Sequence, residues 1–248
     1  MLRLLRCEWI KLKRSRFLLI GILGTLIVPF FVVVKGLMGY RADPERVMDL
    51  FTLYDGAFLF LMLLFAPMVL TILHAWIISR EYTDGTLKNI YVIPVSKTAF
   101  LWGKILFAAI LNFLFMLLSW LEILVLACLC GCFIPVTDLT PLSALFFLIR
   151  MLFGGAFLCV TQLPFIGLTI RTKGFMVPMI TVAAVILVNV VLSGTGVAGF
   201  YPWAASYLLV TGHMSGQSCP AGVSVGIIAG MGLLGLAASL GRVRREEG

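Results

Sequence analysis

Apolar and polar residues form long alternating blocks along this chain, and the apolar blocks predict helices that cross a membrane. A hydrocarbon core of ~30 Å takes about 20 residues of α-helix. Six apolar runs come close to or exceed that length: residues 17–34, 56–79, 100–130, 142–170, 175–192 and 221–240. The third run is longer than the core requires at ~1.5 Å per residue. It is therefore predicted to tilt or to project beyond the membrane.

The first sixteen residues follow a different pattern. Leu2, Leu5, Trp9 and Leu12 recur at helical spacing, and basic residues occupy the positions between them. This spacing predicts an amphipathic helix lying in the plane of the membrane interface, ahead of the first span. A simple basic flank of the first span is the alternative interpretation.

The segments between the apolar runs are polar and contain turn residues. Residues 35–55 carry several charges, residues 80–97 are the most polar inner stretch, and residues 193–220 are too polar to cross a membrane simply. Pro164 predicts a kink in the fourth span. The pattern indicates an all-α integral membrane protein with a single domain over residues 1–248.

The composition supports lipid as the solvent for most of the chain. The hydrophobic fraction is 61% and the charged fraction is 12%, whereas soluble domains are nearer half apolar and a quarter charged. The net charge is +8, with the basic residues gathered at the ends of apolar runs. That placement favours contact with a membrane surface and not with nucleic acid.

The distribution of lysine and arginine predicts the orientation. Fifteen of the nineteen basic residues fall on one face, which holds the N-terminal helix, the loop after the second span and the C-terminal tail. Cytoplasmic loops carry such an excess. Both termini are therefore predicted to be cytoplasmic, in agreement with an even number of spans.

The sequence offers little for an enzyme. Gly103 and Lys104 precede isoleucine, and no glycine-rich phosphate loop surrounds them. His74 and His213 are far apart, and no histidine lies near the cysteines to complete a zinc site. Cys132 and Cys219 both fall on the predicted outer side, which leaves a disulfide between them open. A chain of this kind has no energy source of its own for transport.

The most informative segment follows the second span. It contains Arg80, Glu81, Tyr82, Asp84, Gly85, Thr86, Leu87 and Lys88. A charged stretch leaves the membrane, breaks at Gly85, runs briefly as a helix and breaks again before Pro94. This pattern predicts a small cytoplasmic knob joined rigidly to two spans, of a shape that fits a groove on a soluble partner. An ordinary solvated loop is the alternative.

These residues carry a resemblance to a known family. The run Arg80-Glu81-Tyr82-x-x-Gly85-Thr86, then Pro94, Ser96 and Gly103-Lys104, resembles the loop between the second and third spans of type-2 ABC exporter permeases. Glu8 and Lys11 match the Glu-x-x-Lys of their in-plane N-terminal helix, which here also contains Trp9. The small bacterial subunits of bacitracin-resistance, lantibiotic-immunity and sodium-extrusion systems are similar in length.

The resemblance implies a division of labour between subunits. Two permease chains, alike or related, would pair in the bacterial cytoplasmic membrane with two ABC ATP-binding subunits, which bind the ATP and magnesium. This chain would hold no cofactor. Glu81 would head a coupling helix with residues 86–93 as its body, and would face the ATPase. The cargo would be amphiphilic: a peptide antibiotic, a lipid or a drug.

Polar residues inside the spans are costly and deserve separate attention. On the third span Lys104, Asn112, Ser119 and Glu122 fall on one side, at bearings of about 0°, 80°, 60° and 0°. Glu122 and Arg150 are equidistant from the turn between spans three and four. We therefore predict that they pair in the outer half of the membrane, with separate partners or the surface as the alternative.

Three further features are less specific. Asn189 and Gln162 would either line a path or, as we favour, form hydrogen bonds across helices. Tyr201 and Trp203 belong to an aromatic outer segment that is predicted to be a lid or a membrane anchor.

Other functions stay open at this stage. An ion-coupled secondary transporter would need paired charges and preferably inverted repeats. A lipid-acting membrane enzyme would need a catalytic constellation, and a membrane assembly factor would need no coupling loop.

Overall fold

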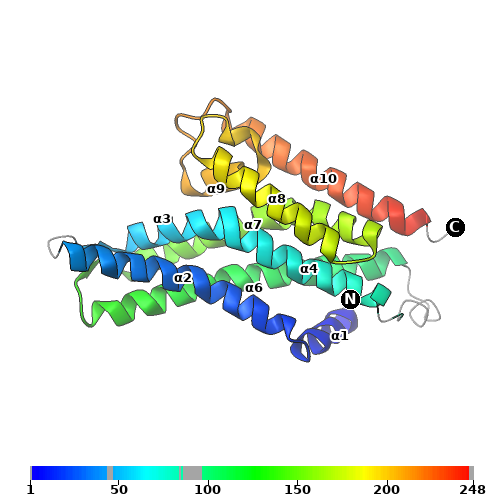
Figure 1. Ribbon diagram of the computed structural model, residues 1–248, viewed down its shortest axis with the longest axis horizontal. Helices are drawn as coiled ribbons and strands as arrows, with labels where there is room; N and C mark the ends of the chain where they lie inside the picture. The colour runs from blue at the N-terminus through cyan, green and yellow to red at the C-terminus, as the bar shows by residue number, and fades with distance from the viewer. Residues whose placement is uncertain (1, 44–46, 84, 86–96, 246–248) are drawn as a thin grey trace.

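The computed structural model describes residues 2–43, 47–83, 85 and 97–245. Six of its helical segments are long and apolar enough to cross a membrane. They lie roughly along the long axis of the molecule (Figure 1), and both chain termini lie at one end of it. We call this the inner end, following the charge-based prediction, and the opposite end the outer end.

The elements follow one another in a simple order. They are α1 (Leu2–Lys13), α2 (Phe17–Ala42), β1 (Met48–Asp49), α3 (Leu50–Phe60), the π-helical turn η1 (Leu61–Phe65), α4 (Ala66–Thr83), α6 (Lys97–Gly131), β2 (Val136–Thr137), α7 (Pro141–Thr172), α8 (Met176–Ser193), the 3₁₀ turn η2 (Ala198–Phe200), α9 (Pro202–Thr211) and α10 (Ala221–Arg245).

Six candidate membrane-spanning helices confirm the predicted number of spans, and the first two extend furthest beyond their predicted bounds. The first continues to Ala42 as α2, and the second begins at Leu50. Much of the polar segment 35–55 is therefore helical and not a loop. Arg41 lies in the last turn of α2, and Asp49 accepts hydrogen bonds from the amides of Phe51 and Thr52 to start α3, so these charges do not break a helix.

The second span is a single rod with a defect in its middle. The helices α3 and α4 join through η1, where the backbone widens into a π-helical turn, and Pro67 follows directly. Such turns are rare and are frequent at functional sites. The hydrophobic pattern of residues 56–79 gave no sign of the π-helical turn, because a continuous apolar run has the same composition with or without one.

The outer segment before the last span folds back into the protein. Eight of the ten residues of α9 are buried, among them Trp203, Tyr207 and Leu208. At ten residues α9 is too short to cross a membrane. Nearby, the two-residue strands β1 and β2 pair in parallel, so that the outer ends of the first and second hairpins are tied together.

The last span is held against the fourth by glycine. A Cβ atom on Gly235 would lie 2.6 Å from the backbone nitrogen of Pro164, which no side chain allows. Ser239, one turn further, bonds its own helix and faces Gly167. Small residues let two backbones approach closely within a membrane, where packing replaces the hydrophobic effect. This contact fixes α10 along α7.

Candidate functional site

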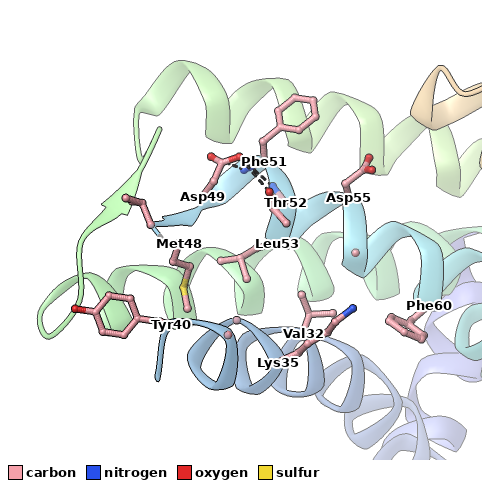
Figure 2. Close-up of a pocket in the computed structure, with 14 residues that line it drawn as sticks. Val32, Lys35, Tyr40, Met48, Asp49, Phe51, Thr52, Leu53, Asp55 and Phe60 are labelled. Atoms are coloured by element: carbon pink, nitrogen blue, oxygen red, sulfur yellow. Dashed lines mark hydrogen bonds between the residues drawn. The ribbon is translucent and has the colours of Figure 1, made fainter. Parts of the chain in front are cut away.

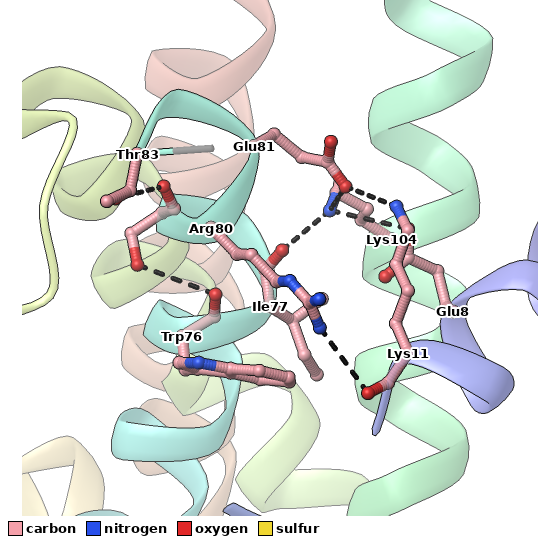
Figure 3. A network of polar contacts seen from close by, with 9 residues as sticks. Glu8, Lys11, Trp76, Ile77, Arg80, Glu81, Thr83 and Lys104 are labelled. Atoms are coloured by element: carbon pink, nitrogen blue, oxygen red, sulfur yellow. Dashed lines mark hydrogen bonds and ion pairs between the residues drawn. The ribbon is translucent and has the colours of Figure 1, made fainter. Parts of the chain in front are cut away.

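Four charged side chains form a closed ring at the inner end (Figure 3). Lys11 Nζ lies 2.6 Å from Glu81 Oε1 and 3.4 Å from Glu8 Oε1. Lys104 Nζ lies 3.3 Å from Glu81 Oε1 and 3.5 Å from Glu8 Oε1. Each lysine therefore contacts both glutamates, and the charges alternate around the ring. We call these four residues the charge ring.

The charge ring joins three separate elements. Glu8 and Lys11 come from α1, Glu81 from the last turn of α4, and Lys104 from the start of α6. Glu8, Glu81 and Lys104 are 6%, 2% and 4% exposed. Lone charges so deeply buried would be prohibitively costly. The ring compensates them and fixes the position of α1 against the second and third spans.

Neighbouring backbone groups complete the ring. Lys104 Nζ also donates to the carbonyl of Ile77 at 2.6 Å, and the Arg80 guanidinium donates to the carbonyl of Lys11 at 3.4 Å. The Arg80 guanidinium carbon lies 5.2 Å from the centre of the Trp76 ring. The last turn of α4 is thus bound to α1 and α6 by both charges and backbone.

An apolar contact lies beside the charges. Leu12 is buried against Ile77, Phe107 and Leu111, with Leu5 at its edge. Trp9, which shares the predicted apolar stripe of α1, is 45% exposed. The amphipathic helix is confirmed, but its protein-facing side is made by Leu5, Glu8 and Leu12, and Trp9 points away from the protein.

The ring holds the Lys11 ammonium in its charged form. Partial burial alone would lower the pKa of Lys11, but its hydrogen bond to Glu81 and the charges of Glu8 and Glu81 outweigh the burial and raise the pKa above 10.5. Lys11 therefore stays cationic at any physiological pH.

The family resemblance implied that Glu81 heads a coupling helix and faces the ATPase, and this stays a prediction. In the structure Glu81 is buried, and its carboxylate accepts hydrogen bonds from Lys11 and Lys104. Gly85 has a positive φ of 65°, which fits the predicted break there. Asp84, Thr86, Leu87 and Lys88 lie outside the described residues, so the coupling role of this segment stays a prediction.

The predicted ion pair between Glu122 and Arg150 is wrong. Glu122 Oε1 instead accepts a hydrogen bond from the hydroxyl of Thr25 on α2, at 3.0 Å. The four polar residues of the α6 stripe are turned towards the protein, but they meet different neighbours. Lys104 meets α1 and α4, Glu122 meets α2, and Asn112 donates to the carbonyl of Gly155 on α7 at 2.8 Å.

Arg150 binds the end of a helix. Its Nε donates at 3.0 Å to the carbonyl of Val210, in the last turn of α9. The rings of Phe51, Phe58 and Phe146 surround the guanidinium, with ring centres 5.3–5.9 Å from its central carbon. A helix C-terminus carries partial negative charge, and aromatic faces attract cations. These neutral groups replace the carboxylate that sequence spacing had suggested.

The buried amides form hydrogen bonds across helices, as favoured from the sequence. Asn189 on α8 and Gln162 on α7 both donate to backbone carbonyls of the second span. Tyr201 and Trp203 also turn into the protein: Tyr201 donates to the carbonyl of Val185, and Trp203 packs on Phe165. Neither is set out as a surface anchor, and a lid role for α9 stays a prediction.

A cavity of about 480 Å³ opens at the outer end (Figure 2), between the last turns of α2 and the first turns of α3. Its apolar lining includes Val32, Leu53 and Phe60, and Lys35 and Asp55 add charge to it. This volume lies within the range of small-molecule sites. The sequence gave no signal for it, because residues 35–55 read as a loop.

The cysteines form no cross-link. Cys132 is exposed, Cys219 is buried and both are free thiols, so the disulfide left open by the sequence is not formed.

Comparison with known proteins agrees with this architecture. The model of the ABC-2 family transporter proteins matches residues 4–192, which include the charge ring and the first five spans. The chain is also similar to the bacitracin transport permease protein BCRB of Bacillus licheniformis, with 26% identity over 182 residues, 73% of this chain and 85% of that protein. The chain is therefore a multi-pass membrane protein of the ABC-2 transporter family.

Proposed function

We propose that this chain is the membrane-spanning subunit of an ABC exporter and works with a separate ATP-binding subunit and a second permease chain. The observation that carries the proposal is the charge ring. It binds α1 to the last turn of α4 and the first turns of α6. A force applied at the end of α4 and the start of α6 would move three elements as one body.

The cost of separating buried charges favours movement of α1, α4 and α6 as one body. Removing one partner of a buried ion pair costs about 3–5 kcal/mol, because a charge is left uncompensated. Displacing α4 or α6 alone would separate Glu81 from Lys11 or from Lys104. The low-energy motion therefore keeps the ring intact and carries the inner ends of the second and third spans with it.

The cargo is proposed to be amphiphilic: a peptide antibiotic, a lipid or a drug. The relative named a bacitracin transport permease supports a peptide antibiotic. The outer cavity, with apolar walls and the charges of Lys35 and Asp55, has a suitable size and polarity for part of such a molecule. We place the inner end in the cytoplasm, and the cavity then faces outward.

Affinity purification in mild detergent from the native membrane tests the proposal. An ATP-hydrolysing subunit is expected to purify with the chain, and cells without the chain are expected to be more sensitive to bacitracin. Recovery of the folded chain with no ATPase would contradict the exporter and favour an ion-driven carrier or an assembly factor. ATPase recovery with unchanged bacitracin sensitivity would contradict only the choice of cargo.

A further inference from the structure

The break in the second span leaves the carbonyl of Leu63 without its usual helical donor. Pro67 has no N–H, so it cannot donate to the carbonyl of Leu63, four residues earlier. In the adjoining π-helical turn the amide of Ala66 donates to the carbonyl of Leu61, five residues earlier. The helix is therefore loosened over about one turn, near the middle of the second span.

Polar side chains from two neighbouring spans bond to the backbone at the break. Asn189 Nδ2 on α8 donates to the freed carbonyl of Leu63 at 2.8 Å. Gln162 Nε2 on α7 donates to the carbonyl of Pro67 at 3.4 Å, and its Oε1 accepts from the hydroxyl of Thr71 at 2.8 Å. Asn189, Gln162 and Thr71 are all almost completely buried.

The packing around the break is adaptable. Met62 in η1 lies with Met116 of α6 against Gly154 of α7, where a Cβ atom would stand 3.1–3.2 Å from both methionine side chains. Methionine has a flexible, unbranched side chain that repacks at low cost. The Asn189 Oδ1 atom is buried and has no hydrogen-bond partner within the described residues, so this conformation does not use all of its bonding capacity.

The break also separates two functional regions. Below it, α4 runs to Glu81 and the charge ring. Above it, α3 lines the outer cavity through residues such as Leu53 and Asp55. A bend at residues 61–67 would move one region relative to the other without breaking either.

We propose that residues 61–67 are the hinge that links the charge ring to the outer cavity, and that Asn189 and Gln162 are its positioning residues. They hold the opened backbone in a defined geometry, so that the two halves of the second span turn about one point. The inference rests on the proposed function, since it assigns the hinge to the transport cycle.

Restoring the regular backbone hydrogen bond between residues 67 and 63 tests the hinge. Pro67→Ala supplies the N–H that donates to the Leu63 carbonyl in a regular helix, and the Asn189 amide then becomes redundant. Asn189→Ala alone is expected to lower the yield of folded protein, and the double variant Pro67→Ala/Asn189→Ala is expected to restore it. The double variant should still purify with the ATPase but should lose bacitracin-stimulated ATP hydrolysis and bacitracin resistance. A double variant with wild-type stimulation and resistance would overturn the hinge.

A spin-label distance measurement tests the hinge in a chain that keeps both Pro67 and Asn189. Spin labels would be placed at the exposed inner ends of α4 and α7, Thr83 and Thr172, and in a second sample at the outer positions Phe51 and Leu142. With a non-hydrolysable ATP analogue bound to the complex, the inner distance is expected to shift while the outer distance shifts less. Equal shifts would mean a rigid span and would overturn the proposal. Failure of the proposed function is separately visible, because the wild-type chain would then purify without an ATPase.

Discussion

Charged side chains at the inner end of this protein contact one another, whereas those in the outer half contact neutral groups. At the inner end, two glutamates and two lysines form an alternating ring with distances of 2.6–3.5 Å. In the outer half, Glu122 and Arg150 stay apart, and each meets neutral groups: a hydroxyl for Glu122, a helix end and aromatic rings for Arg150.

The difference shows what each arrangement can do. The charge ring binds three elements through alternating charges. Displacing one element would separate its charged side chain from the opposite charges and leave those charges uncompensated. A charge that contacts only hydroxyls, carbonyls or aromatic rings is stabilised by its own neutral neighbours. Its interaction with other charges is weak. The proposed movement of the inner end as one body therefore rests on linked charges, and the outer half has no such link between Glu122 and Arg150.

The largest expected effect comes from opening the ring. Lys104→Gln removes a cation that contacts both Glu8 and Glu81 in a buried position, and we expect a loss of about 3–5 kcal/mol in the free energy of unfolding. Thermal unfolding in detergent, followed by size-exclusion chromatography, measures it. Lys13→Gln, which removes an exposed positive charge from α1, is the matched control. Equal stability of the two variants would show that the ring contributes nothing.

The next effect comes from Arg150. Arg150→Ala leaves the Val210 carbonyl without its donor and empties a site between three phenylalanine rings, so we expect a loss of about 1–3 kcal/mol. Arg150→Lys keeps the charge but cannot reproduce the planar contacts, and an intermediate loss is expected. The same unfolding assay ranks the variants, and a fully stable Arg150→Ala would contradict the contact with α9.

A smaller effect distinguishes separate charges from a pair. Glu122→Gln retains an acceptor for Thr25, so its loss should stay below about 1 kcal/mol. The losses of Glu122→Gln and Arg150→Gln should add within about 0.3–0.5 kcal/mol in the double variant. If the double variant loses clearly less stability than the sum of the two single variants, Glu122 and Arg150 interact directly, which contradicts the structure.

The smallest effect concerns pH. The pKa of Lys11 is raised in the folded protein, so its contribution to stability is complete below the ordinary pKa of 10.5. The contribution is lost as the pH rises through the raised, folded-state pKa. The stability gap between the wild-type protein and Lys11→Gln should therefore be constant from pH 7 to pH 9 and should close only above pH 10.5. A gap that closes below pH 9 would contradict the raised pKa.

The sequence predicted what depends on composition over many residues. Six spans and the amphipathic N-terminal helix follow from apolar runs and their spacing. The resemblance at Glu8, Lys11, Glu81 and Gly103-Lys104 directed attention to the residues that form the ring. It did not show that they meet one another, since 70 positions separate Lys11 from Glu81.

Features that depend on tertiary partners could not be predicted in this way. Glu122 and Arg150 lie at matched distances from a turn, but rotation of each helix about its own axis decides which neighbour a side chain meets. The outer cavity needs α2 to continue through a charged stretch, against its polarity. The hinge needs Asn189 to reach the Leu63 carbonyl that Pro67 leaves open, and Gln162 to reach the carbonyl of Pro67, each from another span.

The most direct test of the account measures whether the charge ring couples this chain to an ATPase. The wild-type chain, Lys104→Gln and Lys13→Gln would be reconstituted in lipid nanodiscs, with the folded fraction of each selected by chromatography, and bacitracin-stimulated ATP hydrolysis would be measured with the co-purified ATP-binding subunit. We predict that Lys104→Gln loses the stimulation while Lys13→Gln keeps it. A folded Lys104→Gln chain with wild-type stimulation would contradict the central claim.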